Sequence, residues 1–189
     1  MREILLLSLL IIFSGLAASA NLTVEVVDDN GDRLNSELSL TQNGQEIASS
    51  NSFLETSVNE SENYNLTQNV TEGPDVKIKN FSITEDFDFR PKIYSESPSG
   101  ENFLTNTDPL YFVNQSIAFA EAEISVDRSE PDRIAKCEAL DGSKCGEWTV
   151  NNTQDYPNSV DDAGINSENY LYIVDSFSGY TTGEIAPKP

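Results

Sequence analysis

Carboxylates are the reactive side chains that this chain has in quantity, because histidine is absent. The 189 residues include 32 Asp and Glu and no His. The absence of histidine excludes Ser-His-Asp and Cys-His nucleophile systems, and it excludes zinc or iron sites that need histidine ligands. Carboxylates can still hydrolyse a glycosidic bond as a pair, or bind calcium as a cluster of oxygen ligands.

Two pairs of acids have a spacing that is compatible with glycoside hydrolysis. Glu121 and Glu123 are two residues apart, and so are Asp86 and Asp88. On a strand, such side chains share one face and lie about 6.5–7 Å apart. Pairs of this kind also arise freely among 32 acids, so we interpret them as a solvated strand face and predict that the protein is not an enzyme. A secreted carbohydrate-active enzyme or carbohydrate-binding module is the alternative.

One acidic turn and one acidic loop are the candidate cation sites. Oxygen-only ligands suit calcium, but neither segment has the ligand frame of an EF-hand. We therefore favour ordinary turn chemistry, expect no other cofactor, and keep a calcium-dependent binding module as a further alternative. The residues are Asp28, Asp29 and Asp32 in the turn, and Asp161, Asp162 and Asn166 in the loop.

Two cysteines and seven glycosylation motifs are typical of an exported chain. Cys137 and Cys145 are eight residues apart, and we predict that they form a disulfide. Seven Asn-x-Ser/Thr motifs indicate a glycosylated surface protein, although richness in Asn, Ser and Thr also produces such motifs. The favoured acceptors are Asn21, Asn59, Asn65, Asn69 and Asn151, whereas Asn80 and Asn114 lie near predicted strands.

The first 20 residues have the layout of a secretory signal peptide. Met1-Arg2 is a short positive start, Ile4 to Phe13 is an apolar run, and Ala18-Ser19-Ala20 supplies small residues. The run has about half the length that a membrane-spanning helix needs, so we prefer cleavage after Ala20 to a membrane anchor. No second apolar run follows, so we expect residues 21–189 to be secreted or associated with the cell surface, without membrane insertion.

The charge of the chain bears on its partners and its surroundings. Lys and Arg total 11, which gives a formal charge of −21. Such a charge repels nucleic-acid phosphates and anionic lipid, so neither is expected as a partner. We interpret it as the surface of a protein from a salt-adapted (halophilic) microbe, because strong salt screens the self-repulsion. The folded state is then expected to lose stability when the salt concentration is lowered.

Alternating apolar residues predict strands over most of the mature chain. Segment 23–40 alternates on both sides of Asn30-Gly31, which predicts a β-hairpin, and Asn43-Gly44 predicts a second one. Short strands with evenly spaced turns continue to about residue 84, which is typical of a β-sandwich or barrel. The pattern restarts with 117–126, the cleanest strand of the chain.

The rest of the second half is expected to add a hairpin and one further strand. Segments 133–137 and 145–150 are predicted strand partners, with the turn at Asp141-Gly142. Segment 170–177 is the last strong strand, and a turn at 178–180 is expected before the chain frays.

The start of the mature chain resembles a known family of small sandwiches. Its matching residues are Val24, Val26, Asp28, Gly31, Leu38, Leu40, Asn43 and Gly44. They are similar to carboxypeptidase-regulatory, transthyretin-like or PEGA-type β-sandwich modules of exported archaeal and bacterial proteins. The resemblance implies a spacer or binding domain without catalytic residues. With the restart of the pattern, we predict two small antiparallel Ig-like or transthyretin-like β-sandwich domains, 21–84 and 85–186, and a tail at 187–189.

These observations predict a non-enzymatic surface protein with a structural, adhesion or ligand-presenting role. Rigid sheets would hold loops and exposed aromatic side chains outward, where a glycan or protein partner could meet them. The candidate binding residues are Tyr156, Tyr180 and the loop 151–169.

Overall fold

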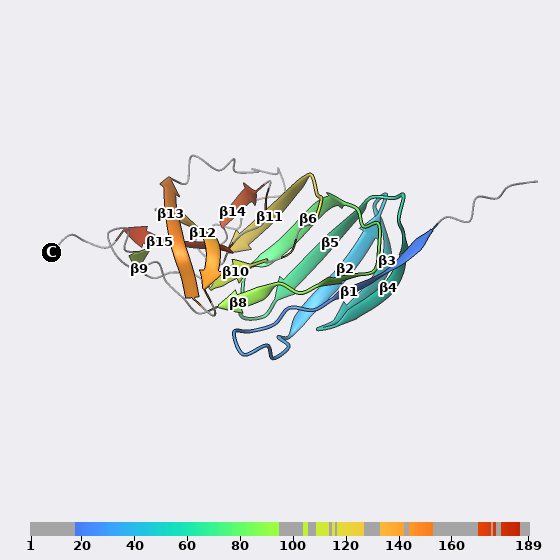
Figure 1. Ribbon diagram of the computed structural model, residues 1–189, viewed down its shortest axis with the longest axis horizontal. Coiled ribbons are helices and arrows are strands. Elements are labelled where there is room, and N and C mark those ends of the chain that lie inside the picture. Colours follow the sequence, from blue (N-terminus) through green and yellow to red (C-terminus); the bar gives the residue numbers. More distant parts are fainter. Residues whose placement is uncertain are drawn as a thin grey trace, which may run out of the picture.

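The described part of the chain is built from strands alone. The computed structural model describes residues 18–94, 104–105, 109–113, 115, 117–126, 133–141, 144–152, 170–174, 176 and 179–185. These residues hold fifteen β-strands and no helix, which confirms the predicted all-β class (Figure 1). Within those segments, no helix is long and apolar enough to cross a membrane.

Eight strands come from the first half of the chain and seven from the second. The first eight are β1 (Ser19–Val24), β2 (Ser36–Gln42), β3 (Gln45–Asn51), β4 (Leu54–Asn59), β5 (Tyr64–Val70), β6 (Asp75–Phe81), β7 (Phe87–Phe89) and β8 (Lys92–Tyr94). The others are β9 (Leu104–Thr105), β10 (Leu110–Phe112), β11 (Glu121–Val126), β12 (Arg133–Asp141), β13 (Lys144–Asn152), β14 (Tyr170–Val174) and β15 (Gly179–Ile185).

Six strands form an antiparallel sheet, which we call sheet I. Their order is β14-β11-β6-β5-β2-β3. Successive side chains of a strand point to opposite faces, so β2, β5, β6 and β11 each have one buried row, whereas the edge strand β3 has no buried residue. In β2, for example, Leu38 and Leu40 are buried, whereas Glu37 is exposed and Ser39 is half-buried.

The opposite layer, sheet II, is assembled from two smaller sheets. Their strand orders are β4-β1-β7 and β13-β12-β15-β10-β8, and β9 adds to β15. The segment after β1 joins them, because Val27 N–H donates to Pro91 O at 3.1 Å and Ile93 N–H donates to Val27 O at 2.8 Å. The parallel pairing of β1 with β7 therefore continues past Pro91 into β8.

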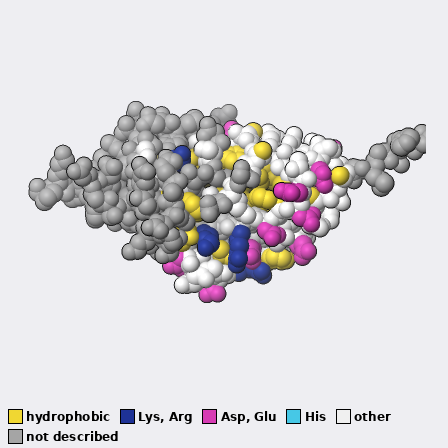
Figure 2. All heavy atoms as spheres, in the orientation of Figure 1, with side chains coloured by type: hydrophobic (Ala, Val, Ile, Leu, Met, Phe, Trp, Pro, Cys, Tyr) yellow, Lys and Arg dark blue, Asp and Glu magenta, His cyan; other side chains and the backbone are white. Residues whose placement is uncertain are grey.

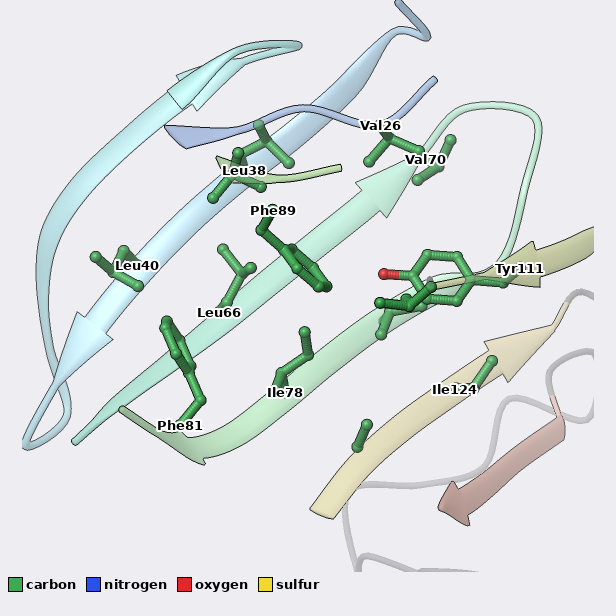
Figure 3. Close-up of a cluster of buried hydrophobic side chains, with 14 of the residues drawn as sticks. Val26, Leu38, Leu40, Leu66, Val70, Ile78, Phe81, Phe89, Tyr111 and Ile124 are labelled. Carbon is green, nitrogen blue, oxygen red and sulfur yellow. The ribbon is translucent and has the colours of Figure 1, made fainter. Parts of the chain in front are cut away.

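One hydrophobic core lies between the two layers. Figure 3 shows Leu40, Leu66 and Ile78 of sheet I pointing to the side on which Phe89 and Tyr111 of sheet II lie. All five side chains are at most 1% exposed. Full burial of a large apolar side chain stabilises the folded state by about 1.5–3 kcal/mol relative to exposure, so this core is the main source of stability.

The core and sheet I both cross the boundary predicted at residue 84. β6 ends before this boundary and β11 begins after it, yet the strands pair with Ile78 opposite Ala122 and Val76 opposite Ile124. The same core cluster includes side chains from both sides of the boundary. Segments assigned to two predicted domains thus share one sheet and one core in the part of the chain that the structure describes.

The hairpin predicted over 23–40 is wrong in its extent, although its turn is present. Gly31 takes a left-handed φ of 86°, and Val27 bridges Arg33 around the turn. Beyond the turn the strands separate, because β1 pairs with β4 and β7 whereas β2 pairs with β3 and β5. The two strands therefore lie in opposite layers and do not pair with each other. The alternating pattern is compatible with this arrangement as well as with a hairpin, because the apolar residues of both strands reach the same core.

Several other strand predictions are confirmed. Asn43 and Gly44 take φ values of 51° and 77° and form the two-residue turn between β2 and β3. The strand predicted over 117–126 is confirmed from Glu121 onward, where β11 buries Ala122, Ile124 and Val126 on one face, but Ala118 and Ala120 precede the strand and are exposed. β12 and β13 pair as an antiparallel hairpin.

The turn predicted at 178–180 is wrong, because Gly179 begins β15. This strand lies between β12 and β10 in sheet II. A Cβ atom at Gly179 would lie 2.8 Å from both Leu110 Cδ1 and Phe112 Cδ2. The glycine that indicated a turn is instead needed for the close approach of neighbouring side chains.

One polar contact crosses the core between the layers. Tyr111 O–H donates to Gln68 Oε1 at 2.5 Å, and both side chains are fully buried. Among the described residues, Gln68 Nε2 has no hydrogen-bond partner. Burial raises the pKa of Tyr111 well above its usual 10.0, so this hydroxyl remains a donor.

We predict that Tyr111→Phe destabilises the protein by about 1–3 kcal/mol, because it leaves the buried Gln68 oxygen without a donor. The double variant Tyr111→Phe/Gln68→Leu should recover much of this loss, since it removes both polar groups. Urea unfolding at constant high salt measures the three free energies. A single variant within error of the wild type would show that the contact contributes nothing.

Candidate functional site

Polar side chains cover the outward face of sheet I over β2, β3 and β5. The alternation that sends leucines into the core sends hydroxyl, amide and carboxylate groups to this face. The register aligns them in two rows, each with one residue from β3, β2 and β5. The rows, which together we call the polar face, are Asn51–Glu37–Asn69 and Ser49–Ser39–Thr67.

Two adjoining grooves follow the polar face. The larger has a volume of about 330 Å³ and is lined by the whole polar face with Leu38, Glu46 and Ser50. The second, of about 290 Å³, shares Glu37, Asn51 and Asn69 with the first and extends to Asn35, Ser36, Val70, Thr71 and Asp75. No Lys or Arg is among the residues that line these two grooves.

The groups in the grooves suit a ligand rich in hydroxyl groups. Ser39 Oγ and Ser49 Oγ donate to Glu46 carboxylate oxygens at 3.1 and 2.9 Å, which orients both hydroxyls. The amides can donate and accept, and the carboxylates can only accept. Because no cation balances the carboxylates among the lining residues, the grooves favour neutral or cationic ligands and disfavour anions.

Asp75 makes one end of the second groove acidic. Partial burial raises the pKa of Asp75 above its usual 3.8, and the negative charge of Glu37 adds to this shift. The Val70 N–H, which donates to Asp75 Oδ1 at 3.2 Å, opposes it. The two carboxylates are therefore close enough to sense each other.

The acid pair Glu121 and Glu123 shares one lysine on the outward face of sheet I. The register places Lys79 opposite Glu121, and Lys79 Nζ lies 2.7 Å from Glu121 Oε1 and also contacts Glu123 Oε1. Burial alone would lower the pKa of Lys79, but hydrogen bonds and the charges of both glutamates outweigh it, so the pKa is raised above 10.5. The pair thus has a structural partner that the sequence did not indicate.

Two other candidate acids, Asp28 and Asp86, also have structural partners. Asp28 Oδ1 accepts hydrogen bonds from the N–H groups of Asp32 and Asn30 at 2.8 and 2.9 Å. The pKa of Asp28 is lowered, mainly by the hydrogen bond from Asp32 N–H, which outweighs the effect of burial. The hydrogen bonds from Asn30 lower it further. Asp86 Oδ1 accepts from Asn21 N–H at 2.7 Å. No group of three or more Cys, Asp or Glu that could hold a metal occurs in the described residues.

The Glu25 carboxylate pairs with two arginines and so holds the 26–33 turn against sheet II. This pairing was not predicted from the sequence. Glu25 Oε2 lies 2.8 Å from Arg33 Nη2, and Glu25 Oε1 lies 2.9 Å from Arg90 Nε. The Arg33 guanidinium also stacks 4.4 Å from the centre of the Phe53 ring. Figure 2 shows most of the visible Lys and Arg side chains close together at the lower centre, with acids scattered around them. Alternation in the sequence gave no signal for this pairing across the fold.

The remaining predicted site residues have mixed outcomes. Cys137 is buried and is not free, and the register places it opposite Trp148, with Cys145 opposite Leu140. The Cys145 side chain lies outside the described residues, so the disulfide stays a prediction. Tyr180 is only 2% exposed and donates to Ser176 O at 3.0 Å, so it is not an outward-facing aromatic.

Other predictions fall outside what the structure describes. They concern Tyr156, Asp161, Asp162, Asn166, Asn114 and the Asn151 side chain. Of the remaining glycosylation motifs, Asn21, Asn69 and Asn80 are exposed, and Asn59 and Asn65 are half-buried.

Comparison with known proteins gives no assignment for the polar face. No family model, no curated protein and no solved structure matches this chain. The polar face is therefore interpreted from its own geometry.

We predict that Lys79→Met destabilises the protein by about 0.2–1 kcal/mol at neutral pH, as for other ion pairs near the surface. The folded-state pKa of Lys79 is raised, so its contribution is complete below the ordinary value of 10.5 and is lost as pH rises through the folded value. Urea unfolding of wild type and variant from about pH 8 to about pH 11.5 measures the difference. Lys92→Met, which removes the same charge elsewhere, is the control. A difference that stays constant over this range would contradict the assignment.

Proposed function

We propose that this chain is an exported, non-enzymatic β-sandwich protein of the cell surface or its surroundings, which presents the polar face to a glycan or protein partner. The observation that supports this most is the pair of adjoining grooves on one continuous polar surface. The core behind sheet I keeps that surface rigid, because the same strands supply both faces. A rigid, preformed surface loses little conformational entropy on binding.

One layered domain is the architecture that we infer. Sheets I and II enclose the larger of two core clusters, and strands from both halves of the chain contribute to sheet I; the smaller cluster, Tyr94, Leu110, Phe112 and Cys137, lies within sheet II. This arrangement favours one β-sandwich in place of two small ones. The resemblance to transthyretin-like modules is compatible with it, because those modules are also layered sheets.

Export is supported at the start of β1. Cleavage after Ala20 would turn the Asn21 nitrogen into an α-ammonium group, and Asp86 Oδ1 lies 2.7 Å from that nitrogen. A carboxylate at this distance would pair the new charge. β1 would keep its pairs with β4 from Asn21 onward and lose those of Ser19 and Ala20.

A presenting role is favoured over glycoside hydrolysis by the surroundings of the acid pair. Glu121 and Glu123 are both ion-paired with Lys79 on an outward sheet face. A glycosidase places its two carboxyl groups on either side of the bond that it cleaves, whereas both carboxylates here contact the same ammonium group.

A glycan array in strong salt, probed with the unglycosylated mature protein, tests this function. We predict binding to neutral glycans, and at least a tenfold loss of affinity in Ser39→Arg, because the long side chain fills the larger groove. The matched control is Ser57→Arg on β4, since both serines donate one hydrogen bond on a strand surface. Absence of glycan binding, or equal binding by both variants, would contradict a glycan site on the polar face.

A further inference from the structure

Asn69 is the glycosylation motif that the fold leaves most accessible beside the grooves. It lies on β5 with its side chain exposed, and it lines both grooves. Its motif partner Thr71 is also exposed and lines the second groove. Asn69 and Thr71 are therefore reachable from the same side of sheet I.

Hydrogen bonds distinguish Asn69 from three of the other acceptors, whereas Asn80, whose side chain makes none to the described residues, has a half-buried motif partner in Ser82. Asn21 Oδ1 accepts from Ser57 Oγ at 3.0 Å, and Asn65 Oδ1 accepts from Asn80 N–H at 2.9 Å. Asn59 Oδ1 accepts from both the N–H and the hydroxyl of Ser61. The Asn69 side-chain amide makes no hydrogen bond to the described residues, so it can turn freely toward an enzyme.

We propose that Asn69 carries an N-linked saccharide, which lies over the grooves of the polar face. In the transfer, Asn69 Nδ2 forms a bond to the anomeric carbon of a saccharide attached to a lipid phosphate. The bond from that carbon to the phosphate oxygen breaks, the lipid phosphate leaves with the electron pair, and Nδ2 loses one proton to the transferase. The acceptor motif is completed by Thr71.

The surroundings of Asn69 suit an attached saccharide. The next row of the polar face, Ser49–Ser39–Thr67, offers three side-chain hydroxyls, and the amide of Asn51 lies in the same row as Asn69. Ser39 and Ser49, which donate to Glu46, can accept from sugar hydroxyls, and Thr67 and Asn51 can both donate and accept. This inference rests on the proposed export, and it restricts the proposed glycan binding to copies without a saccharide at Asn69, because an attached saccharide covers the grooves.

Glycopeptide mass spectrometry of the protein recovered outside the cells that make it tests the inference. We expect a saccharide on most copies of the Asn69 peptide, loss of it in Asn69→Gln and Thr71→Val, and retention in Thr71→Ser. Asn65→Gln, on the same strand face, is the matched control and should leave the Asn69 peptide modified. Circular dichroism checks that each variant is folded.

The outcomes separate this inference from the proposed function. Protein that is recovered outside the cell with Asn69 unmodified overturns the modification and leaves export standing. Protein found only inside the cell with its leader attached overturns export, and the modification with it. On the glycan array, the modified protein should bind at least tenfold more weakly than the unmodified one, and equal binding would show that the saccharide does not cover the grooves.

Discussion

The structure depends on the burial of two apolar sheet faces against each other. An antiparallel sheet with one apolar face is stable only if another layer covers that face. Leu66 and Ile78 of sheet I meet Phe89 and Tyr111 of sheet II, and none of the four is more than 1% exposed. Because sheet I takes strands from residues 36 to 174, neither half of the chain completes this cover alone.

The same alternation determines the surface. A strand that sends Leu38 inward sends Glu37 and Ser39 outward, so the core and the polar face are two consequences of one pattern. A chain with a formal charge of −21 also has few cations to place. Several of these cations pair with acids. Lys79 lies between Glu121 and Glu123, and Arg33 and Arg90 both pair with Glu25.

Local patterns in the sequence predicted local structure well. The Asn43-Gly44 turn and the buried face of β11 depend on neighbouring residues alone, and both are as expected. The pairing of β6 with β11 and the central place of β15 depend on contacts between distant segments, which alternation does not encode. The polar face was missed for the same reason, because its rows form only when β2, β3 and β5 align, and the sequence pointed to Tyr180, which the core buries.

Disulfide trapping across β6 and β11 tests the shared sheet most directly. Lys77 and Glu123 are register partners on the outward face, so the double variant Lys77→Cys/Glu123→Cys should form a cross-link on mild oxidation of the folded protein. Thr67 lies one strand further from Glu123, at about 9–10 Å across the sheet, so Thr67→Cys/Glu123→Cys should not. A folded Lys77→Cys/Glu123→Cys protein that remains unlinked, as seen by peptide mass spectrometry, would contradict a sheet that joins the two halves of the chain.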